Sequence, residues 1–191
     1  MADEGAFDRF IERWRRNEGG AERANFPLFL TELCALLDLP QPDPADATHE
    51  RNDYVFERDV TIVDDDGKVT HRRIDLYRRG CFVLEAKQSR IKGGAKEVPL
   101  APEQDALPGL EVEAARGRRS AHRGWDVLMR NAREQAEQYA RGLPTSHGWP
   151  PYILVCDVGH VIEVFADFSG QGKNYRQFPD REGFRIYLED L

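Results

Sequence analysis

The chain has 191 residues, of which 40% are hydrophobic and 32% charged, and its formal net charge is -7. This length and composition are typical of one globular domain and exclude a disordered chain. No apolar run is long enough to span a membrane, and the acidic N-terminus lacks a signal-peptide pattern, so we expect a cytoplasmic protein without a membrane partner. The negative charge argues against a free-standing domain that holds nucleic acid by charge alone.

The three cysteines lie far apart, and each is inside an apolar run. They are Cys34, Cys81 and Cys156, and no CxxC pair is present. We therefore expect three buried, reduced thiols rather than a disulfide or a metal site.

Residues 1–45 are predicted to form two amphipathic helices. The first spans about residues 6–17 and is marked by apolar side chains at helical spacing. The second follows from the same period between Phe26 and Leu37, with Pro27 expected in its first turn, where a missing N–H costs nothing. Three prolines from residue 40 to 44 end it and form a stiff connector.

Residues 54–88 are predicted to form three consecutive antiparallel strands. The first, at 54–63, alternates so that one face is buried, and the residues of that face are Tyr54, Phe56, Val60 and Ile62. Asp66-Gly67 is a hairpin turn signal, and the second strand follows at 69–77. A turn around Gly80 leads to the third strand, 81–87.

Residues 91–124 show no sustained period and contain many glycines and prolines, so we expect a long basic loop. Such a loop is usually functional, here by closing over a polyanion, or disordered. Residues 125–191 then read as a helix to about Arg141, two strands at 152–156 and 160–165, and a tail that packs back. The element order predicts a single α/β domain over 1–191, with a mixed β-sheet flanked by helices.

The stretch from Arg72 to Gln88 carries the chemistry. Its apolar strand ends in Glu85-Ala86-Lys87, a local inconsistency that is typical of functional sites. Glu85 and Lys87 are two apart and share one face of the strand. Asp75 and Glu85 are equally distant from Gly80, so the two carboxylates lie opposite one another if the turn is centred there.

Two adjacent carboxylates favour a cation. Mg²⁺, or Mn²⁺ as its substitute, prefers such oxygens, and the Ala86 carbonyl would be a third ligand. Lys87 would then position a water, help to deprotonate it or stabilise charge on a phosphate. The competing interpretation is a pair of surface salt bridges, Asp75 with Arg73 and Glu85 with Lys87.

The segment IDLYRRGCFVLEAKQ resembles the active-site hairpin of the PD-(D/E)XK nuclease superfamily. Further segments resemble the N-terminal endonuclease domain of MmeI-like (type IIG/IIL) restriction–modification DNA methyltransferases, and together they cover nearly the whole chain: GGAERANFPLFLTELCALLDLP, NDYVFERDVTIV, REQAEQYARGLP and PPYILVCDVGHVIEVFADFSG. The resemblance implies that Asp75 and Glu85 bind metal and that Lys87 is the catalytic lysine. Ile74 stands where the superfamily name has proline.

Two further residues have counterparts in some superfamily members. Glu22 matches the N-terminal-helix glutamate that assists the metal, although Glu32 competes for that match and a helix-terminus role explains Glu22 equally well. Gln135 resembles a helix glutamine near the site, or is simply hydrogen-bonded at a helix edge. From charge placement, the candidate DNA contacts are Arg73, Arg90, Lys92, Arg118 and Arg119.

The resemblance implies a Mg²⁺-dependent endonuclease domain that hydrolyses double-stranded DNA in restriction–modification or phage defence. S-adenosylmethionine would belong to a methyltransferase domain, and sequence recognition to a target-recognition domain, both in a longer parent chain from which this domain is cut. Cleavage of both strands needs two active sites, hence a transient dimer on DNA. The alternative function is a non-cleaving regulatory or DNA-backbone-binding module of a DNA methyltransferase.

Overall fold

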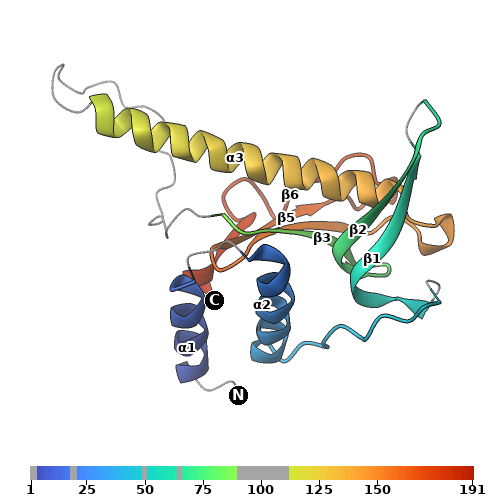
Figure 1. Cartoon of the computed structure of the whole chain (residues 1–191), viewed down its shortest axis with the longest axis horizontal. Helices are drawn as coiled ribbons and strands as arrows, with labels where there is room; N and C mark the ends of the chain where they lie inside the picture. The colour runs from blue at the N-terminus through green and yellow to red at the C-terminus, as the bar shows by residue number, and fades with distance from the viewer. Residues whose placement is uncertain (1–3, 18–20, 49–50, 64–65, 90–111) are drawn as a thin grey trace.

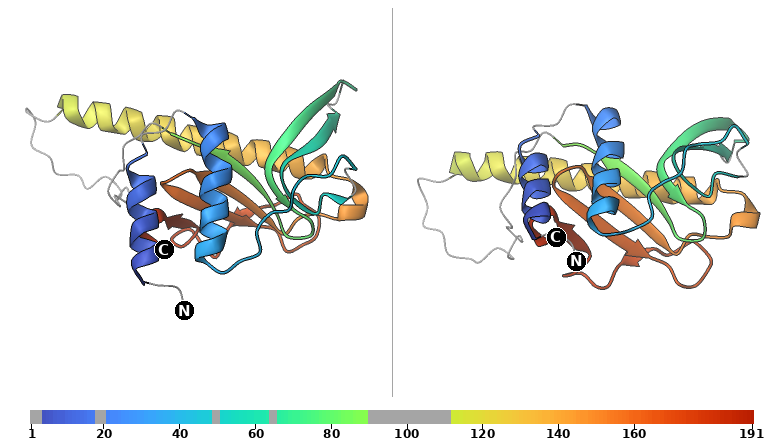
Figure 2. Two further views of the ribbon diagram at one scale, coloured as in Figure 1. Left: turned by 60° about the horizontal axis from the view of Figure 1, so that its bottom comes forward. Right: turned by 90° about the horizontal axis from the view of Figure 1, so that it is seen from below.

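The computed structural model describes residues 4–17, 21–48, 51–63, 66–89 and 112–191, with the side chains of residues 4 and 112–123 excepted. The sheet is covered on one face by helix α3 (Val112–Arg141) and on the other by α1 (Glu4–Arg15) and α2 (Glu22–Leu36) (Figures 1 and 2). This is the predicted α/β architecture, and it is consistent with the PD-(D/E)XK fold.

The described residues form one mixed, seven-stranded sheet. Its first three strands are consecutive antiparallel neighbours, as predicted: β1 (Tyr54–Val63), β2 (Val69–Arg78) and β3 (Phe82–Lys87). Strand β4 (Tyr152–Asp157) pairs with β3 in parallel, and α3 supplies the long crossover that a parallel pair requires. Strand β5 (Val161–Ala166) pairs antiparallel with β4, and the tail adds β6 (Arg176–Gln177) and β7 (Arg185–Tyr187) beside β5.

The sheet separates two hydrophobic cores. The α3-side core joins α3 to one face of the sheet and includes Trp125, Met129, Val83, Ile153 and Val155. The α2-side core joins α1 and α2 to the other face and includes Trp14, Phe26, Phe29, Leu84 and Ala86. Strands β3 and β4 contribute to both cores, which explains why their sequences are continuous apolar runs rather than alternating ones.

The prediction that β1 buries a single face is wrong. Tyr54 and Phe56 pack on the α2-side core, whereas Val60 and Ile62, which have the same parity, pack on the α3-side core. Residues two apart on a regular strand share a face, so the strand turns over between these pairs. The change occurs around Glu57, whose φ of 53° is left-handed.

The helix boundaries differ from prediction at two points. Helix α2 begins at Glu22, so Pro27 is inside the helix and not in its first turn. Helix α3 begins at Val112, so the second part of the predicted loop 91–124 is helical, and residues 90–111 lie outside the described residues. Gly117 and Gly124 lie inside this helix without ending it, because an isolated glycine costs only about 1 kcal/mol relative to alanine.

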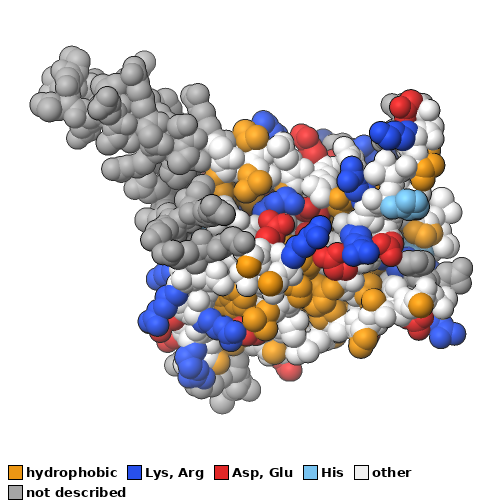
Figure 3. Space-filling model, viewed as in Figure 1, with side chains coloured by type: hydrophobic (Ala, Val, Ile, Leu, Met, Phe, Trp, Pro, Cys, Tyr) orange, Lys and Arg blue, Asp and Glu red, His pale blue; other side chains and the backbone are white. Residues whose placement is uncertain are grey.

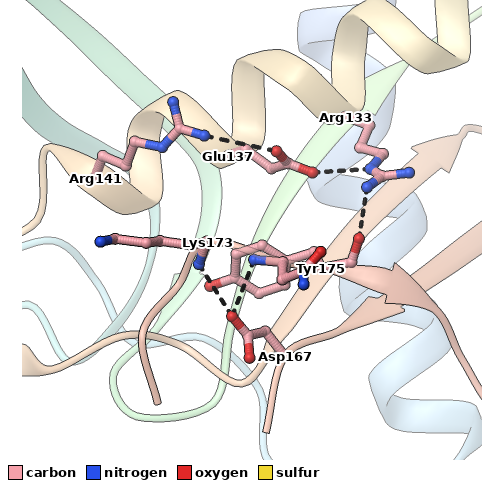
Figure 4. Close-up of polar contacts among 7 residues, drawn as sticks. Arg133, Glu137, Arg141, Asp167, Lys173 and Tyr175 are labelled. Carbon is pink, nitrogen blue, oxygen red and sulfur yellow. Dashed lines mark hydrogen bonds and ion pairs between the residues drawn. The ribbon is translucent and has the colours of Figure 1, made fainter. Parts of the chain in front are cut away.

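Helix α3 is tied to the loop that follows β5 (Figure 4). Arg133 donates from Nη2 to the Tyr175 carbonyl at 2.6 Å and from Nε to Glu137 at 2.8 Å. Arg141 lies 3.9 Å from the other oxygen of Glu137. Within the loop, the buried Asp167 carboxylate accepts the backbone N–H of Lys173 at 3.0 Å, which holds the loop in a compact form against the helix.

All three cysteines are free, but only Cys156 is buried, so the prediction of three buried thiols is wrong for Cys34 and Cys81. Both of these lie at positions of intermediate exposure. Among the described residues, no helix combines the length and the apolar composition that a membrane crossing requires.

Gly142, directly after α3, is where the helix meets the distal part of β1. A Cβ at this position would lie 2.7 Å from Cγ2 of Val60 and 2.9 Å from the Thr61 carbonyl oxygen. Gly142→Ala should therefore lower the free energy of unfolding by about 1–3 kcal/mol, measured by urea denaturation.

Gly124, inside α3, is the matched control because a Cβ there would meet no atom within 4 Å. Gly124→Ala should raise stability by about 0.5–1 kcal/mol through helix propensity. Equal effects of the two substitutions would contradict the close packing of β1 on the end of α3.

Candidate active site

The turn between β2 and β3 is centred on Gly80, whose φ of 63° suits glycine. The paired residues are Leu76 with Leu84, Tyr77 with Val83 and Arg78 with Phe82, so the predicted register is confirmed. The ladder ends at Leu76 and Leu84, one step before Asp75 would face Glu85. Beyond this point the Asp75 side chain replaces the backbone of β2 as the hydrogen-bond acceptor, because its Oδ2 accepts the Ala86 N–H at 2.7 Å.

The carbonyl of Ala86 faces the gap between β2 and β3. Along a strand, the N–H and C=O of one residue point to the same side, and successive residues alternate sides. Since the Ala86 N–H points to Asp75, its carbonyl does too. The Lys87 carbonyl instead accepts the Val158 N–H at 2.8 Å, on the β4 side. Asp75 and Ala86 thus line one gap.

Glu85 and Lys87 share a face, as predicted, with Nζ of Lys87 only 2.6 Å from Oε1 of Glu85. This is a buried pair rather than a surface salt bridge, since the Glu85 side chain is 2% exposed. The other half of the competing interpretation is also wrong, because Arg73 lies against Glu57 and Asp59 instead of Asp75. The second oxygen of Glu85, Oε2, is buried and has no hydrogen-bond partner in the described part of the chain.

Burial dominates the proton equilibria of the three residues. It raises the pKa of Asp75 to about 6, opposed by the Ala86 hydrogen bond and the charge of Lys87. It raises the pKa of Glu85 to about 7, reinforced by the neighbouring Asp75 charge. Burial alone would lower the pKa of Lys87, but the Glu85 carboxylate outweighs it and the pKa is raised. One ammonium is therefore insufficient to keep both buried carboxylates ionised.

These residues fit a hard cation such as Mg²⁺. Mg²⁺ is held in proteins by one or two carboxylates plus waters, and it prefers oxygen ligands. The buried Oε2 of Glu85 has no hydrogen-bond partner among the described residues, so it is available as a metal ligand. The Asp75 charge acts on Glu85, and Asp75 itself accepts the Ala86 N–H. Among the described residues, no group of three or more His, Cys, Asp or Glu side chains forms a metal-binding cluster, so the candidate ligands are two carboxylates and one backbone carbonyl.

Glu22 lies beside these residues, at the first position of α2. Its Oε2 accepts the backbone N–H of Gln88 at 3.1 Å, and its charge contributes to the raised pKa values of Asp75 and Glu85. The competing Glu32 is engaged elsewhere, by Trp14 at 2.9 Å. The structure thus brings Glu22 to the end of β3, where its role as a supporting residue stays a prediction.

Gln135 contacts the site through a residue that the sequence did not single out. Its Nε2 donates to the hydroxyl of Tyr139 at 2.5 Å. Tyr139 is buried, and burial together with the Glu85 charge raises the pKa of its hydroxyl. Tyr139 packs in the α3-side core, and a tyrosine at a core position of a helix gives no sequence signal of an interaction with Glu85.

Of the five candidate DNA contacts, only Arg73 has a side chain that the structure describes. Arg73 is exposed on β2 and paired with two acids. Arg90 and Lys92 lie outside the described residues, and Arg118 and Arg119 are in α3, where only the backbone is described. On the face seen in Figure 3, basic and acidic side chains are interspersed below α3.

Asp157 anchors the chain where it leaves β3. It ends β4 beside Lys87 and is 1% exposed. Its Oδ1 accepts the Ser89 N–H at 2.8 Å, and its Oδ2 accepts the Ser89 hydroxyl at 2.6 Å and the Trp125 indole N–H at 2.8 Å. The sequence contained a signal for Asp157, because this acid directly follows the apolar run of β4 just as Glu85 follows the apolar run of β3.

The family described as MmeI, N-terminal domain, matches residues 2–191. The chain belongs to the MmeI N-terminal domain family. No curated protein and no solved structure shows significant similarity to it. Membership places this MmeI-family domain in the context of restriction–modification and agrees with a nuclease-like domain.

The raised pKa values predict how the stability of the metal-free MmeI-family domain depends on pH. Asp75 and Glu85 bind protons more tightly when folded than when unfolded, so their contribution is fully present below about pH 4 and is lost as pH rises through 6 to 7. The free energy of unfolding should fall by on the order of 2 kcal/mol between pH 5 and pH 8, measured by urea denaturation.

Glu85→Gln is the control for this prediction, because it removes the group with the higher pKa of the two. The variant should lose about half or more of the pH dependence. A wild-type stability that instead rises over the same interval would contradict the assignment.

The Asp157 anchor gives a second prediction for the MmeI-family domain. In Asp157→Asn, an amide NH₂ replaces one of the two carboxylate oxygens that accept hydrogen bonds from Ser89 and Trp125, so a donor faces a donor. The substitution should lower the free energy of unfolding by about 2–4 kcal/mol. Ser89→Ala removes one donor without orphaning a charge and should cost only about 1 kcal/mol. Thermal and urea denaturation of both variants measure the difference, and equal losses would contradict this role.

Proposed function

We propose that this domain is a Mg²⁺-dependent endonuclease domain that hydrolyses phosphodiester bonds of double-stranded DNA. The observation that carries the proposal is the set of contacts at the end of β3: Asp75 accepts the Ala86 N–H, Lys87 binds Oε1 of Glu85, and the buried Oε2 of Glu85 has no hydrogen-bond partner among the described residues. Membership of a restriction–modification family supports the choice of DNA as the substrate.

The residues would divide the work as follows. Asp75, Glu85 and the Ala86 carbonyl would hold the cation, which when bound supplies positive charge against the phosphate and eases deprotonation of a water. In hydrolysis, the water oxygen bonds to phosphorus, one P–O ester bond breaks, and the strand ends carry a phosphate and a hydroxyl. The raised pKa of Lys87 keeps it an ammonium, so its role is to donate hydrogen bonds to the attacked phosphate rather than to accept the proton from water.

The proposed function includes further domains in a parent chain. A parent chain with methyltransferase and target-recognition domains would supply sequence recognition, and S-adenosylmethionine would be the cofactor of the methyltransferase. Cleavage of both strands would need two copies of the site, hence a transient dimer on DNA. The interspersed charges on the face seen in Figure 3 are consistent with other domains contributing much of the DNA affinity.

Lys87→Ala should reduce Mg²⁺-dependent nicking of supercoiled plasmid by about 100-fold or more, because it removes the ammonium that would face the phosphate. Asp75→Asn should reduce both nicking and Mg²⁺ affinity, because it removes a charged ligand. Plasmid cleavage and isothermal calorimetry measure the two effects.

Lys68→Ala is the matched control, since Lys68 is an exposed lysine in the turn between β1 and β2. It should leave nicking unchanged. Cleavage that persists in both site variants would overturn the assignment, and a wild-type domain that binds no Mg²⁺ would favour the non-cleaving DNA-binding module.

A further inference from the structure

The β1–β2 ladder has a single interruption. The two strands pair at every position from Tyr54 with Arg78 to Val63 with Val69, except for Glu57 and Asp75. Glu57 has a φ of 53°, in the left-handed region that a strand residue other than glycine rarely occupies. The interruption therefore coincides with an unusual backbone conformation, directly across from the proposed metal ligand.

Both strands turn over at this pair. On β1, Phe56 packs on the α2-side core and Val60 on the α3-side core, although they have the same parity. On β2, Leu76 packs on the α2-side core and Ile74 on the α3-side core, again with the same parity. The β1–β2 hairpin thus leaves the plane of the sheet beyond Glu57 and reaches the end of α3, as Figure 1 shows.

The change of face explains how the Asp75 carboxylate reaches its position. In a regular strand a side chain stands perpendicular to the sheet, whereas the N–H groups of the neighbouring strand lie in its plane. Asp75 nevertheless accepts the Ala86 N–H at 2.7 Å, so its carboxylate lies in the plane, where the backbone of β2 would otherwise pair. That orientation also directs it into the gap faced by the Ala86 carbonyl.

We propose that Glu57 is a positioning residue of the active site, whose left-handed backbone conformation interrupts the ladder and turns the Asp75 carboxylate into the gap between β2 and β3. The proposal concerns the backbone conformation of Glu57 rather than its carboxylate. That carboxylate lies 3.8 Å from Arg73 and is 40% exposed, and its charge adds to the raised pKa of Asp75 without making a contact that places the Asp75 side chain. This inference rests on the proposed function for the identity of the cation and for nothing else.

A substitution series at Glu57 tests the proposal. Glycine and asparagine tolerate a left-handed conformation, threonine and valine do not, and none of the four carries a carboxylate. Glu57→Gly and Glu57→Asn should keep the Mg²⁺ dissociation constant within about threefold of wild type, measured by calorimetry at pH 8. Glu57→Thr and Glu57→Val should weaken it by about 10-fold to 100-fold. Thr61→Val is the control for placing valine on an exposed position of β1.

A second readout needs no metal. In the metal-free protein, the Ala86 amide should exchange with solvent about tenfold faster or more in Glu57→Thr than in Glu57→Gly, because it loses the Asp75 acceptor. The glycine and threonine pair preserves the test if the valine variant does not fold.

The outcomes are distinct. Loss of Mg²⁺ affinity in Glu57→Gly equal to that in Glu57→Thr would overturn the inference, since the carboxylate would then be what matters. Unchanged affinity and unchanged Ala86 exchange in Glu57→Thr would overturn it as well. Failure of the wild type to bind Mg²⁺ would instead overturn the proposed function, while Ala86 exchange would still decide the role of Glu57.

Discussion

The structure depends on placing two carboxylates and one ammonium where water is largely excluded. Asp75 and Glu85 are held at the end of β3 with only Lys87 to offset their charge, and burial raises the pKa of both acids. Such an arrangement is unfavourable for a protein without a ligand, because isolated buried charge is costly. A bound cation and a phosphate together would offset the buried charges, which is why we interpret their unfavourable burial as functional.

The surrounding fold fixes the positions of these groups. The α3-side core and the α2-side core hold the central strands from both faces, so the ends of β3 and β4 cannot move independently. Glu22 from α2 and Asp157 from β4 then bind the backbone just after Lys87, at Gln88 and Ser89.

Much of this was predictable from local patterns. Strand parity places Glu85 beside Lys87, and the glycine turn fixes the register of β2 on β3, because both are properties of short segments. The change of face at Glu57 was not predicted, because Tyr54, Phe56, Val60 and Ile62 share one parity, and only Arg58 interrupts it in the sequence. The two halves differ in the core on which they pack. Tyr139 was equally hidden, because a core tyrosine and one beside a buried acid have the same helical spacing. The start of α3 was not predicted, because Gly117 and Gly124 suggest a loop although both lie inside the helix.

The hydrogen bonds of Asp157 bear on how many residues can lie between Ser89 and Trp125. It binds Ser89, directly after β3, and Trp125, inside α3, so one carboxylate ties together both ends of the intervening chain. Loop-closure entropy grows only with the logarithm of length, by about 0.6 kcal/mol for each doubling. The chain between these two residues can therefore gain or lose sequence during evolution while the position of Lys87, held next to the tie, stays the same.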